Sequence, residues 1–221
     1  MAVVGRRVRD YGAARVLSPI TLEGRYVRLE PLSRDHVGPL LEIATGSRDT
    51  FQFTFLARDE PGMKAWVETA LAEHAHGRAL PFATIDRRAN RVVGATRFLN
   101  VEFWAWPPTS PYQRGADVPD VVEIGATWLA PDVQRSGINT EAKLLMLTHA
   151  FDTWRVHRVS LVTDARNVRS RAAIERLGAR LDGVLRAARI AADGGIRDTA
   201  VYSIVEAEWP AVKLALMARL R

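Results

Sequence analysis

The sequence predicts a domain of the α/β (α+β) class. Apolar residues make up 48% of the 221 residues, which is enough for a sizeable core. Segments with strand-like and helix-like apolar spacing follow one another in the order β-α-α-β-β-β-α-β-α-β-β. Around residues 128–147 a strand ends at a proline, and a tight polar turn leads directly into a helix. With no internal repeat, we expect one domain over residues 19–221, preceded by a loosely ordered arm at 1–18.

The first half of the chain predicts a strand region, two helices and a hairpin. Residues 21–32 alternate apolar and polar side chains. Ser33 begins a helix by capping it, and a second helix covers about 60–76 with its apolar residues on one face. The hairpin strands follow at 81–85 and 92–99.

Residues 101–120 interrupt this pattern. Four prolines and the indoles of Trp104 and Trp106 fall in this stretch, and prolines at this density predict an irregular loop. We expect the loop beside the acceptor side of the molecule. The two tryptophans could wall an acceptor pocket, contact a second copy, or hold the loop on its own domain.

The second half predicts alternating strands and helices. Gly178 stops the short helix before it, and the last two strands are joined by Asp193-Gly194-Gly195. We expect strands at 121–129, 158–163, 179–190 and 197–205, and helices at 138–154, 170–177 and 207–219.

Composition narrows the function. The formal net charge is +6, but the arginines are spread along the chain, so nucleic-acid binding is not predicted as the main function. The chain has no cysteine, which excludes disulfides and a cysteine nucleophile and fits a cytoplasmic location. No apolar run approaches the roughly 20 residues that span a bilayer, so no membrane partner is expected. The five histidines lack metal-ligand spacing, so no metal is expected either.

The turn Gln134-Arg135-Ser136-Gly137-Ile138-Asn139-Thr140 predicts an anion-binding site. A turn at a helix N-terminus presents several free backbone N–H groups to one point, and the helix dipole favours negative charge there. Arg135 adds a positive charge, and Gly137 permits close approach. The chain has no G-x-x-x-x-G-K-[ST] motif, which argues against a P-loop nucleotide hydrolase.

This turn resembles the acyl-CoA-binding motif Q/R-x-x-G-x-G/A of the GCN5-related N-acetyltransferases (GNAT). Gly137 matches the first glycine, and Asn139 stands at the last position. Asparagine tolerates a left-handed backbone, so we expect Asn139 to let the loop close. The same substitution resembles the ribosomal-protein N-terminal acetyltransferase (RimJ/RimL-like) branch. The resemblance covers about residues 20–210 and implies the GNAT fold, a mixed, twisted central sheet of about seven strands flanked by helices.

A second stretch, from Asn167 to Gly178, is similar to the family's N-x-x-S…LGF signature. The resemblance implies that Asn167 contacts the pantetheine arm of acetyl-CoA. It also implies that Ser170 is the general acid for the departing thiolate. Ala179 replaces the family's usual aromatic residue. Without the resemblance, Asn167 and Ser170 also fit a simple helix cap.

The segment Glu123-Ile124-Gly125-Ala126-Thr127-Trp128-Leu129 resembles the E-I-G-x-x-L strand of the same branch. Glu123 could accept a proton directly or through water, or it could be a strand-edge carboxylate paired with an arginine. Backbone N–H groups of residues 127–129 would polarise the thioester carbonyl. Tyr202 is an alternative acid or a packed aromatic residue. The expected cofactor-binding residues are Trp128, Leu129, Gln134, Arg135, Ser136, Gly137, Ile138, Asn139, Thr140 and Asn167.

The resemblance implies an acetyl-CoA-dependent N-acetyltransferase in which a primary amine attacks the thioester directly, and a homodimer. Neutralising a lysine side chain at pH 7 costs roughly 4–5 kcal/mol, whereas an α-amine costs only about 1 kcal/mol. A site with one candidate base therefore favours an α-amine, as at a protein N-terminus. A small-molecule amine (a polyamine, an antibiotic or an amino acid) and a non-catalytic CoA-binding sensor remain as alternatives.

Overall fold

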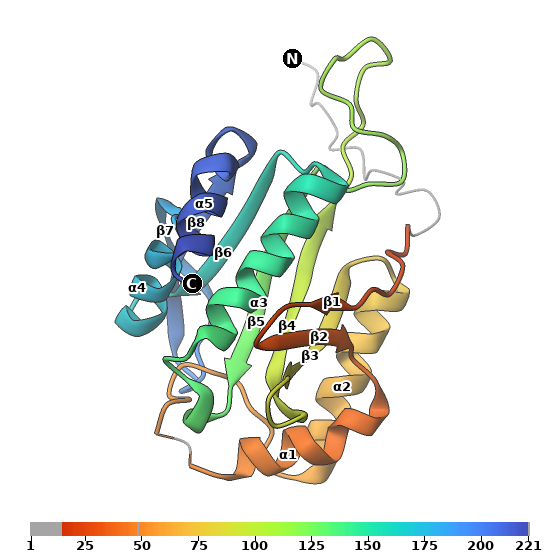
Figure 1. Cartoon of the computed structure of the whole chain (residues 1–221). Helices are drawn as coiled ribbons and strands as arrows, with labels where there is room; N and C mark the ends of the chain where they lie inside the picture. Colours follow the sequence, from red (N-terminus) through yellow and green to blue (C-terminus); the bar gives the residue numbers. More distant parts are fainter. Residues whose placement is uncertain (1–14, 48, 221) are drawn as a thin grey trace.

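The computed structural model describes residues 15–47 and 49–220, which form one eight-stranded sheet with helices on both faces (Figure 1). The strand order is β1-β2-β3-β4-β5-β6-β8-β7. The strands are β1 (Leu22–Glu23), β2 (Val27–Pro31), β3 (Ala79–Asp86), β4 (Arg91–Glu102), β5 (Val121–Leu129), β6 (Arg158–Asp164), β7 (Arg180–Ile190) and β8 (Ile196–Val205). The helices are α1 (Val37–Thr45), α2 (Glu60–Ala75), α3 (Gly137–Thr148), α4 (Val168–Arg176) and α5 (Trp209–Ala218).

The predicted mixed sheet is confirmed, with β5 and β6 as its parallel pair. It has eight strands rather than about seven, because the turn at Gly24 divides the segment 21–32 into two paired strands. The helix expected at 138–154 is also present. Its last turn, His149–Trp154, is a π-helix that ends at Arg155 in a left-handed conformation (φ 57°).

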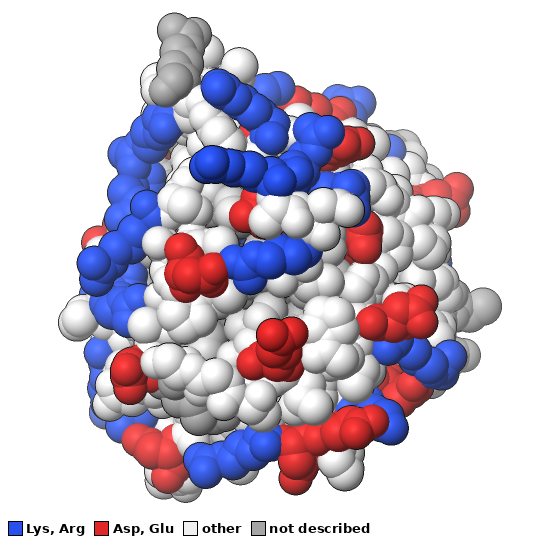
Figure 2. Space-filling view, turned by 60° about the horizontal axis from the view of Figure 1, so that its bottom comes forward, with Lys and Arg blue, Asp and Glu red and all other residues white. Residues whose placement is uncertain are grey.

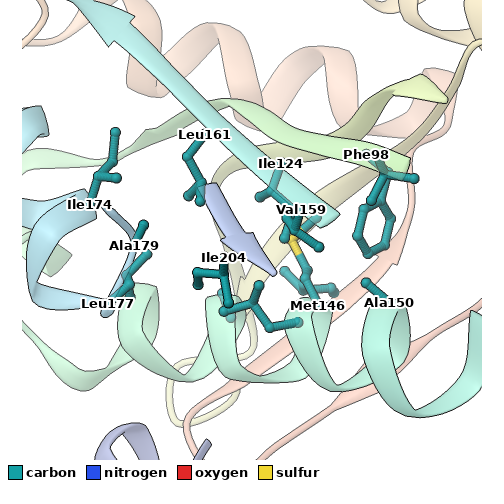
Figure 3. Close-up of a cluster of buried hydrophobic side chains, with 14 of the residues drawn as sticks. Phe98, Ile124, Met146, Ala150, Val159, Leu161, Ile174, Leu177, Ala179 and Ile204 are labelled. Carbon is teal, nitrogen blue, oxygen red and sulfur yellow. The ribbon is translucent and has the colours of Figure 1, made fainter. Parts of the chain in front are cut away.

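Two apolar cores lie on the two faces of the sheet. The larger one packs α3 and α5 against the central strands, where Met146 of α3 and Ala150 of the π-helical turn after it lie close to Val159 and Ile204 (Figure 3). The smaller core packs α1 and α2 against the other face, with contributions from Ala83 and Trp128. Strand β3 is buried at all but its last residue because it is covered on both faces.

A buried carboxylate fixes α3 relative to the first two strands. Glu141 accepts hydrogen bonds from the backbone N–H groups of Arg25 (2.8 Å), Tyr26 (2.6 Å) and Val27 (2.8 Å). Gly24 lies against this carboxylate, because a Cβ there would come within 2.4 Å of Cδ of Glu141. The N-terminal part of α3 is thereby held in place beside the sheet.

The parallel strands β5 and β6 are paired only at their beginnings. Their register ends at Glu123↔Ser160, and β6 instead pairs along its whole length with β8. Beyond Glu123 the two strands separate toward their carboxyl ends (Figure 1). This separation positions the site described below.

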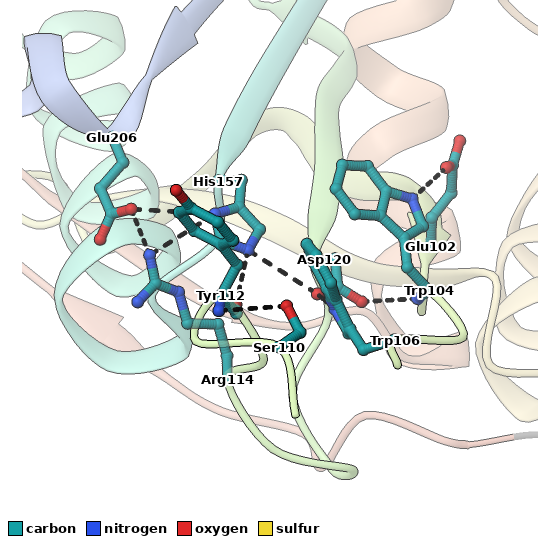
Figure 4. Close-up of polar contacts among 9 residues, drawn as sticks. All are labelled: Glu102, Trp104, Trp106, Ser110, Tyr112, Arg114, Asp120, His157 and Glu206. Atoms are coloured by element: carbon teal, nitrogen blue, oxygen red, sulfur yellow. Dashed lines mark hydrogen bonds and ion pairs between the residues drawn. The ribbon is translucent and has the colours of Figure 1, made fainter. Parts of the chain in front are cut away.

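The loop 103–120 is attached to its own domain at the start of β5. The Asp120 carboxylate accepts hydrogen bonds from the Trp104 backbone N–H (2.5 Å) and from Nε1 of Trp106 (2.6 Å) (Figure 4). The Trp104 ring stacks on His157 at 5.8 Å. The expectation that this loop lies beside the acceptor side was wrong, because the cleft opens at the opposite end of β5 and none of its lining residues belongs to the loop.

The arm expected at 1–18 falls mostly outside the described residues, which start at Arg15. Leu17 is only 5% exposed and is part of the larger core. Its carbonyl oxygen lies 2.8 Å from Nε2 of His74. In the part of the chain that the structure describes, no helix has the length and apolar character needed to cross a membrane.

Candidate active site

A cleft of about 400 Å³ lies where β5 and β6 separate. Its size is within the usual range for a small-molecule site. The walls come from β5, β6, α3, α4, the last hairpin and the loop before α2. The lining includes Phe53, Thr54, Phe55, Trp66, Leu99, Glu123, Ile124, Gly125, Ala126, Thr127, Trp128, Asn139, Lys143, Leu161, Val162, Thr163, Asp164, Asn167, Ser170, Arg189 and Arg197.

Strand β5 carries a β-bulge at the cleft. The register with β4 shifts between Gly125 and Trp128, and Ala126 has a left-handed backbone (φ 48°). Beyond Glu123 this strand has no pairing with β6, so its backbone groups on that side face the cleft. Bulges next to a site commonly redirect the backbone and side chains.

The side chains at the end of β5 are structural. Trp128 is 5% exposed and packs edge-on against Phe51 and Trp66. Leu129 is buried, and its carbonyl oxygen accepts a hydrogen bond from Nε2 of Gln134 (2.9 Å). Trp128 lines the cleft and its Nε1 has no hydrogen-bond partner among the described residues, whereas Leu129 is not one of the lining residues.

Glu123 lies in the cleft with a single hydrogen-bonding side chain. It is 5% exposed, and Nδ2 of Asn100 donates to its Oε2 at 2.7 Å. Burial, as the largest effect, raises the pKa of Glu123 above that of an ordinary glutamate, and the Asn100 hydrogen bond and the charges of Arg189 and Arg197 oppose it. No ion pair to Glu123 is found in the described parts of the chain, so the paired strand-edge alternative is not what the structure shows.

The second motif places Asn167 and Ser170 together on the α4 side of the cleft. Asn167 is the N-cap of α4, and its Oδ1 accepts a hydrogen bond from the Ser170 backbone N–H (3.0 Å). The cap thus exists, but Ser170 contributes only its backbone to it. Both residues line the cleft, and the cap does not use the Ser170 hydroxyl.

Tyr202 does not line the cleft. It is fully buried, with its hydroxyl 2.9 Å from Nε of Arg171 and 2.8 Å from Oε1 of Glu175. The alternating side-chain direction along β8 points it into the larger core, whereas Arg197 lines the cleft. The prediction of Tyr202 as an alternative acid is therefore corrected to a packed aromatic residue.

The predicted anion turn leads into α3. Ser136 is the N-cap, with its Oγ accepting from the Ile138 N–H (3.3 Å) and donating to the Val133 carbonyl (2.6 Å). The left-handed residue is Arg135 (φ 62°). A Cβ at Gly137 would lie 3.4 Å from the Tyr26 ring, an ordinary van der Waals contact, so the fold itself has room for a small side chain there.

The expectation for Asn139 was wrong. Asn139 lies inside α3 and has no left-handed backbone, because the helix begins two residues earlier than a loop closed at 139 would allow. Its Oδ1 is buried without a hydrogen-bond partner among the described residues, and the residue lines the cleft. The side chain, rather than the backbone, is what Asn139 offers to a ligand.

The remaining turn residues have separate roles. Gln134 links three segments, since its Nε2 donates to Oγ1 of Thr50 (2.9 Å) and its Oε1 accepts from Nη2 of Arg169 (2.9 Å). Ile138 is buried in the larger core. Thr140 is half-buried on α3 and does not line the cleft.

Lys143 was not predicted as a site residue. It is 4% exposed, and its Nζ donates to Oγ1 of Thr127 (2.7 Å) and of Thr96 (2.9 Å) beneath the bulge. Burial lowers the pKa of Lys143 to about 7. Sequence reasoning also missed Asn100, Arg189, Arg197 and the segment 53–55, because only the tertiary fold brings these distant segments to the cleft.

Comparison with known proteins identifies the family of this chain. Residues 27–180, well over half of the chain, match the sequence pattern of the family described as the acetyltransferase (GNAT) domain. The chain belongs to the GNAT family of acetyltransferases. It is therefore an N-acetyltransferase, as the sequence predicted.

Three relatives illustrate the similarity. A crystal structure from T. thermophilus, provisionally called an acetyltransferase, is 34% identical, with a TM-score of 0.75 over 93% of this chain and 99% of that one. RimJ from Mycobacterium smegmatis, solved in complex with CoA-disulfide, is 24% identical, with a TM-score of 0.75 over 92% and 96%. A Bacillus subtilis (strain 168) protein, YdaF, provisionally assigned as a ribosomal N-acetyltransferase, is 33% identical over 91 residues. That match spans 41% of this chain and about half (49%) of YdaF.

Proposed function

We propose that the protein transfers an acetyl group from acetyl-CoA to a primary amine, with the α-amine of a protein N-terminus as the preferred acceptor. The observation that carries this proposal is the cleft between the separated strands β5 and β6. It gathers Glu123, Asn139, Asn167 and Ser170 beside the first turn of α3. The RimJ structure with CoA-disulfide and the partial match to YdaF support the same cofactor and acceptor class.

The residues fit acetyl-CoA. The first turn of α3 offers N–H groups without intrahelical partners to the pyrophosphate, and Arg135 adds a positive charge at the same turn. The orphaned Oδ1 of Asn139 can accept an amide N–H of the pantetheine arm. The side-chain amide of Asn167 lies in the same cleft, where it can bind that arm.

The chemistry is a direct transfer. The nitrogen lone pair of the neutral amine attacks the thioester carbonyl carbon, and backbone N–H groups at residues 127–129 stabilise the oxyanion. Collapse of the tetrahedral intermediate breaks the C–S bond. Glu123 takes the proton from the amine nitrogen, directly or through water, and Ser170 gives its hydroxyl proton to the departing thiolate. Glu123 then releases its proton to solvent and the Ser170 alkoxide regains one from solvent, which restores both groups. The raised pKa of Glu123 makes it a stronger base than an exposed glutamate.

The first test is a thiol-release assay with acetyl-CoA over peptides with free or blocked N-termini, lysine-containing peptides and small amines. Mass spectrometry of the product identifies the modified nitrogen. We expect acetylation of free peptide N-termini. Turnover only on lysine side chains or on polyamines would contradict the preferred acceptor. Release of free CoA without an acetylated product would contradict the transfer.

We further propose a cytoplasmic homodimer. A ribosomal-protein acceptor would be encountered in the cytoplasm. Edge strand β7 carries exposed apolar side chains at Leu181, Leu185 and Ile190, which gives a second copy a surface to cover. Sedimentation analysis at micromolar concentration tests this assembly, and a monomer would contradict it.

A further inference from the structure

Two arginines face each other across the last hairpin at the cleft. Arg189 of β7 and Arg197 of β8 are direct partners in the antiparallel register, and both line the cleft. Side chains directly opposite each other in such a pair lie on the same face, with Cβ atoms about 4.5–5.5 Å apart. The hairpin therefore holds two positive charges side by side at the cleft.

Such a pair is unfavourable unless an anion neutralises it. Like charges directly opposite on neighbouring strands are destabilising. The pKa of Arg197 is lowered, first by burial and second by the charge of Arg189. Within 15–47 and 49–220, no ion pair includes either arginine, and the polar side-chain contact of Arg197 is from Nε to Oγ1 of Thr199 (3.1 Å).

Neither of the nearby carboxylates, Asp164 and Glu123, forms an ion pair with Arg189 or Arg197. Asp164 is already paired with Arg166, whose Nη2 and Nε lie 2.8 and 3.1 Å from its two oxygens. Glu123 feels the charges of both Arg189 and Arg197, but its hydrogen bond goes to Asn100. The cleft thus holds two guanidinium groups, whereas Glu123 is its one lining carboxylate, among the described residues, that is not already in an ion pair.

A β-bulge in β7 sets the position of Arg189. The register of β7 with β8 shifts between Leu185 and Arg189, and Ala187 within this bulge has a left-handed backbone (φ 49°). The Ala187 N–H donates to Oδ1 of Asp198 (2.8 Å), which fixes the bulge. A bulge of this kind re-aims the following side chain.

The pair also lies apart from the proposed phosphate site. It belongs to the last hairpin, whereas the cofactor phosphates are assigned to the first turn of α3 near Arg135 and Ser136. On the side of the molecule where Figure 1 places α4 and β7, Lys and Arg side chains form an almost continuous row (Figure 2). A row of this kind gives that side of the molecule a positive potential, which would attract an anionic acceptor.

We infer that Arg189 and Arg197 bind an anionic group, a carboxylate or a phosphate, that the acceptor carries close to its reactive amine. The inference rests on the proposed amine acetylation and adds the acceptor's charge to it. For a protein acceptor it specifies an acidic side chain within the first few residues. Two guanidinium groups suit such a group because each can donate two parallel hydrogen bonds to its oxygens.

The test uses matched acceptors and two separate readouts. The peptides carry a free N-terminus and a single Glu at position two, three, four or five, each matched by a peptide with Gln. Amino acids are compared with their amides in the same way. Thiol release gives KM and kcat, and calorimetry in the presence of CoA gives the Kd of each peptide without requiring turnover.

We expect the best Glu peptide to have a KM and Kd about tenfold lower than its Gln partner, because charge-assisted hydrogen bonds at a partly exposed site contribute about 1.4 kcal/mol. Arg189→Gln and Arg197→Gln should each abolish most of this preference and leave the Kd of acetyl-CoA unchanged. Arg186→Gln is the matched control, since Arg186 is exposed on the same strand and does not line the cleft. Arg197→Lys should restore part of the preference.

The outcomes are distinguishable. Equal KM and Kd for the Glu and Gln peptides, or a loss of acetyl-CoA affinity in the arginine variants, overturns the inference and leaves the proposed acetylation standing. Preferential binding of Glu peptides without acetylation supports the anion site while the proposed acceptor chemistry fails. A preference that persists in both arginine variants also overturns the inference.

Discussion

The two ends of strand β5 differ in whether the polar side chains beside them have partners within the protein. At its start, the Asp120 carboxylate accepts two hydrogen bonds from the loop that precedes it (Figure 4). At the cleft end, Asn139 has an orphaned oxygen, and Arg189 has no ion-pair partner in the described part of the chain. Polar groups that satisfy one another fasten a loop, whereas groups without partners at a cleft are available to a ligand.

The largest expected effect is on Glu123. Glu123→Gln should lower kcat by about 10²- to 10⁴-fold, because the substitution removes the proposed base. In the wild type, kcat should fall as the pH drops through the raised pKa of Glu123, since protonation removes its basic lone pair. A pH–rate profile measures both effects.

Asn100→Ala is the companion variant, because it removes the hydrogen bond that lowers the pKa of Glu123. This variant should move the acidic limb of the profile to higher pH. Wild-type turnover in Glu123→Gln would transfer the role of base to another group.

The second expected effect is loss of the cofactor. Gly137→Glu should weaken acetyl-CoA binding by about 100-fold or more, because it adds bulk and negative charge where the phosphates are proposed to bind. Calorimetry measures the affinity, and circular dichroism checks the fold. Gly137→Ala is the control, since its Cβ would lie 3.4 Å from the Tyr26 ring, which is an ordinary van der Waals contact. A folded Gly137→Glu variant with unchanged affinity would rule out the phosphate assignment.

Ser170 is expected to affect the chemical step alone. Ser170→Ala should reduce kcat by about 10- to 100-fold while the Kd of acetyl-CoA stays nearly constant, because the cap of α4 uses only the Ser170 backbone. Single-turnover kinetics with calorimetry separate the two quantities. Ser170→Cys retains a proton donor and should recover part of the rate. An Ala variant as fast as the wild type would return Ser170 to a structural role.

Lys143 should make stability depend on pH. The unfolded chain holds the Lys143 proton up to a pH near 10.5, whereas the folded protein releases it near pH 7. Between these values the unfolded state binds more protons, so the free energy of unfolding rises with pH by up to about 1.4 kcal/mol per unit.

Urea unfolding at pH 7, 8 and 9 checks this dependence. Lys143→Met should flatten the pH dependence and stabilise the protein most at pH 7. Lys64→Met is the control, because Lys64 is exposed and pairs with Glu60 at 2.7 Å. Equal slopes in the wild type and Lys143→Met would show that Lys143 stays charged in the folded protein.

The smallest effect is expected at the other end of β5. Asp120→Ala should lower the free energy of unfolding by about 2 kcal/mol, because it leaves two donors of the loop without their acceptor. The value of kcat/KM should remain that of the wild type, since no residue of this loop lines the cleft. Chemical denaturation and steady-state kinetics measure the two quantities. A large loss of activity with an intact fold would connect this loop to the acceptor site.

Most of the fold could be predicted from local patterns. Alternating and helical apolar spacing gave the elements in their observed order, since those periods report which face of a strand or helix is buried. The strand–turn–helix at 128–147 and the Asn167–Ser170 pair located two walls of the cleft. Errors arose where position in space mattered, as for the loop 103–120 and the direction of Tyr202.

The amino-acid sequence by itself indicated the family, the turn before α3 and the cap of α4, because short motifs fix a turn and a cap through local hydrogen bonds. Only the tertiary structure decided which polar groups are buried and which have no ion-pair partner. Lys143 reads as an ordinary helical lysine until the bulge of β5 covers it. Arg189 and Arg197 read as scattered charges until the strand register sets them opposite each other. Burial and pairing of this kind depend on contacts between distant segments, and no local spacing encodes them.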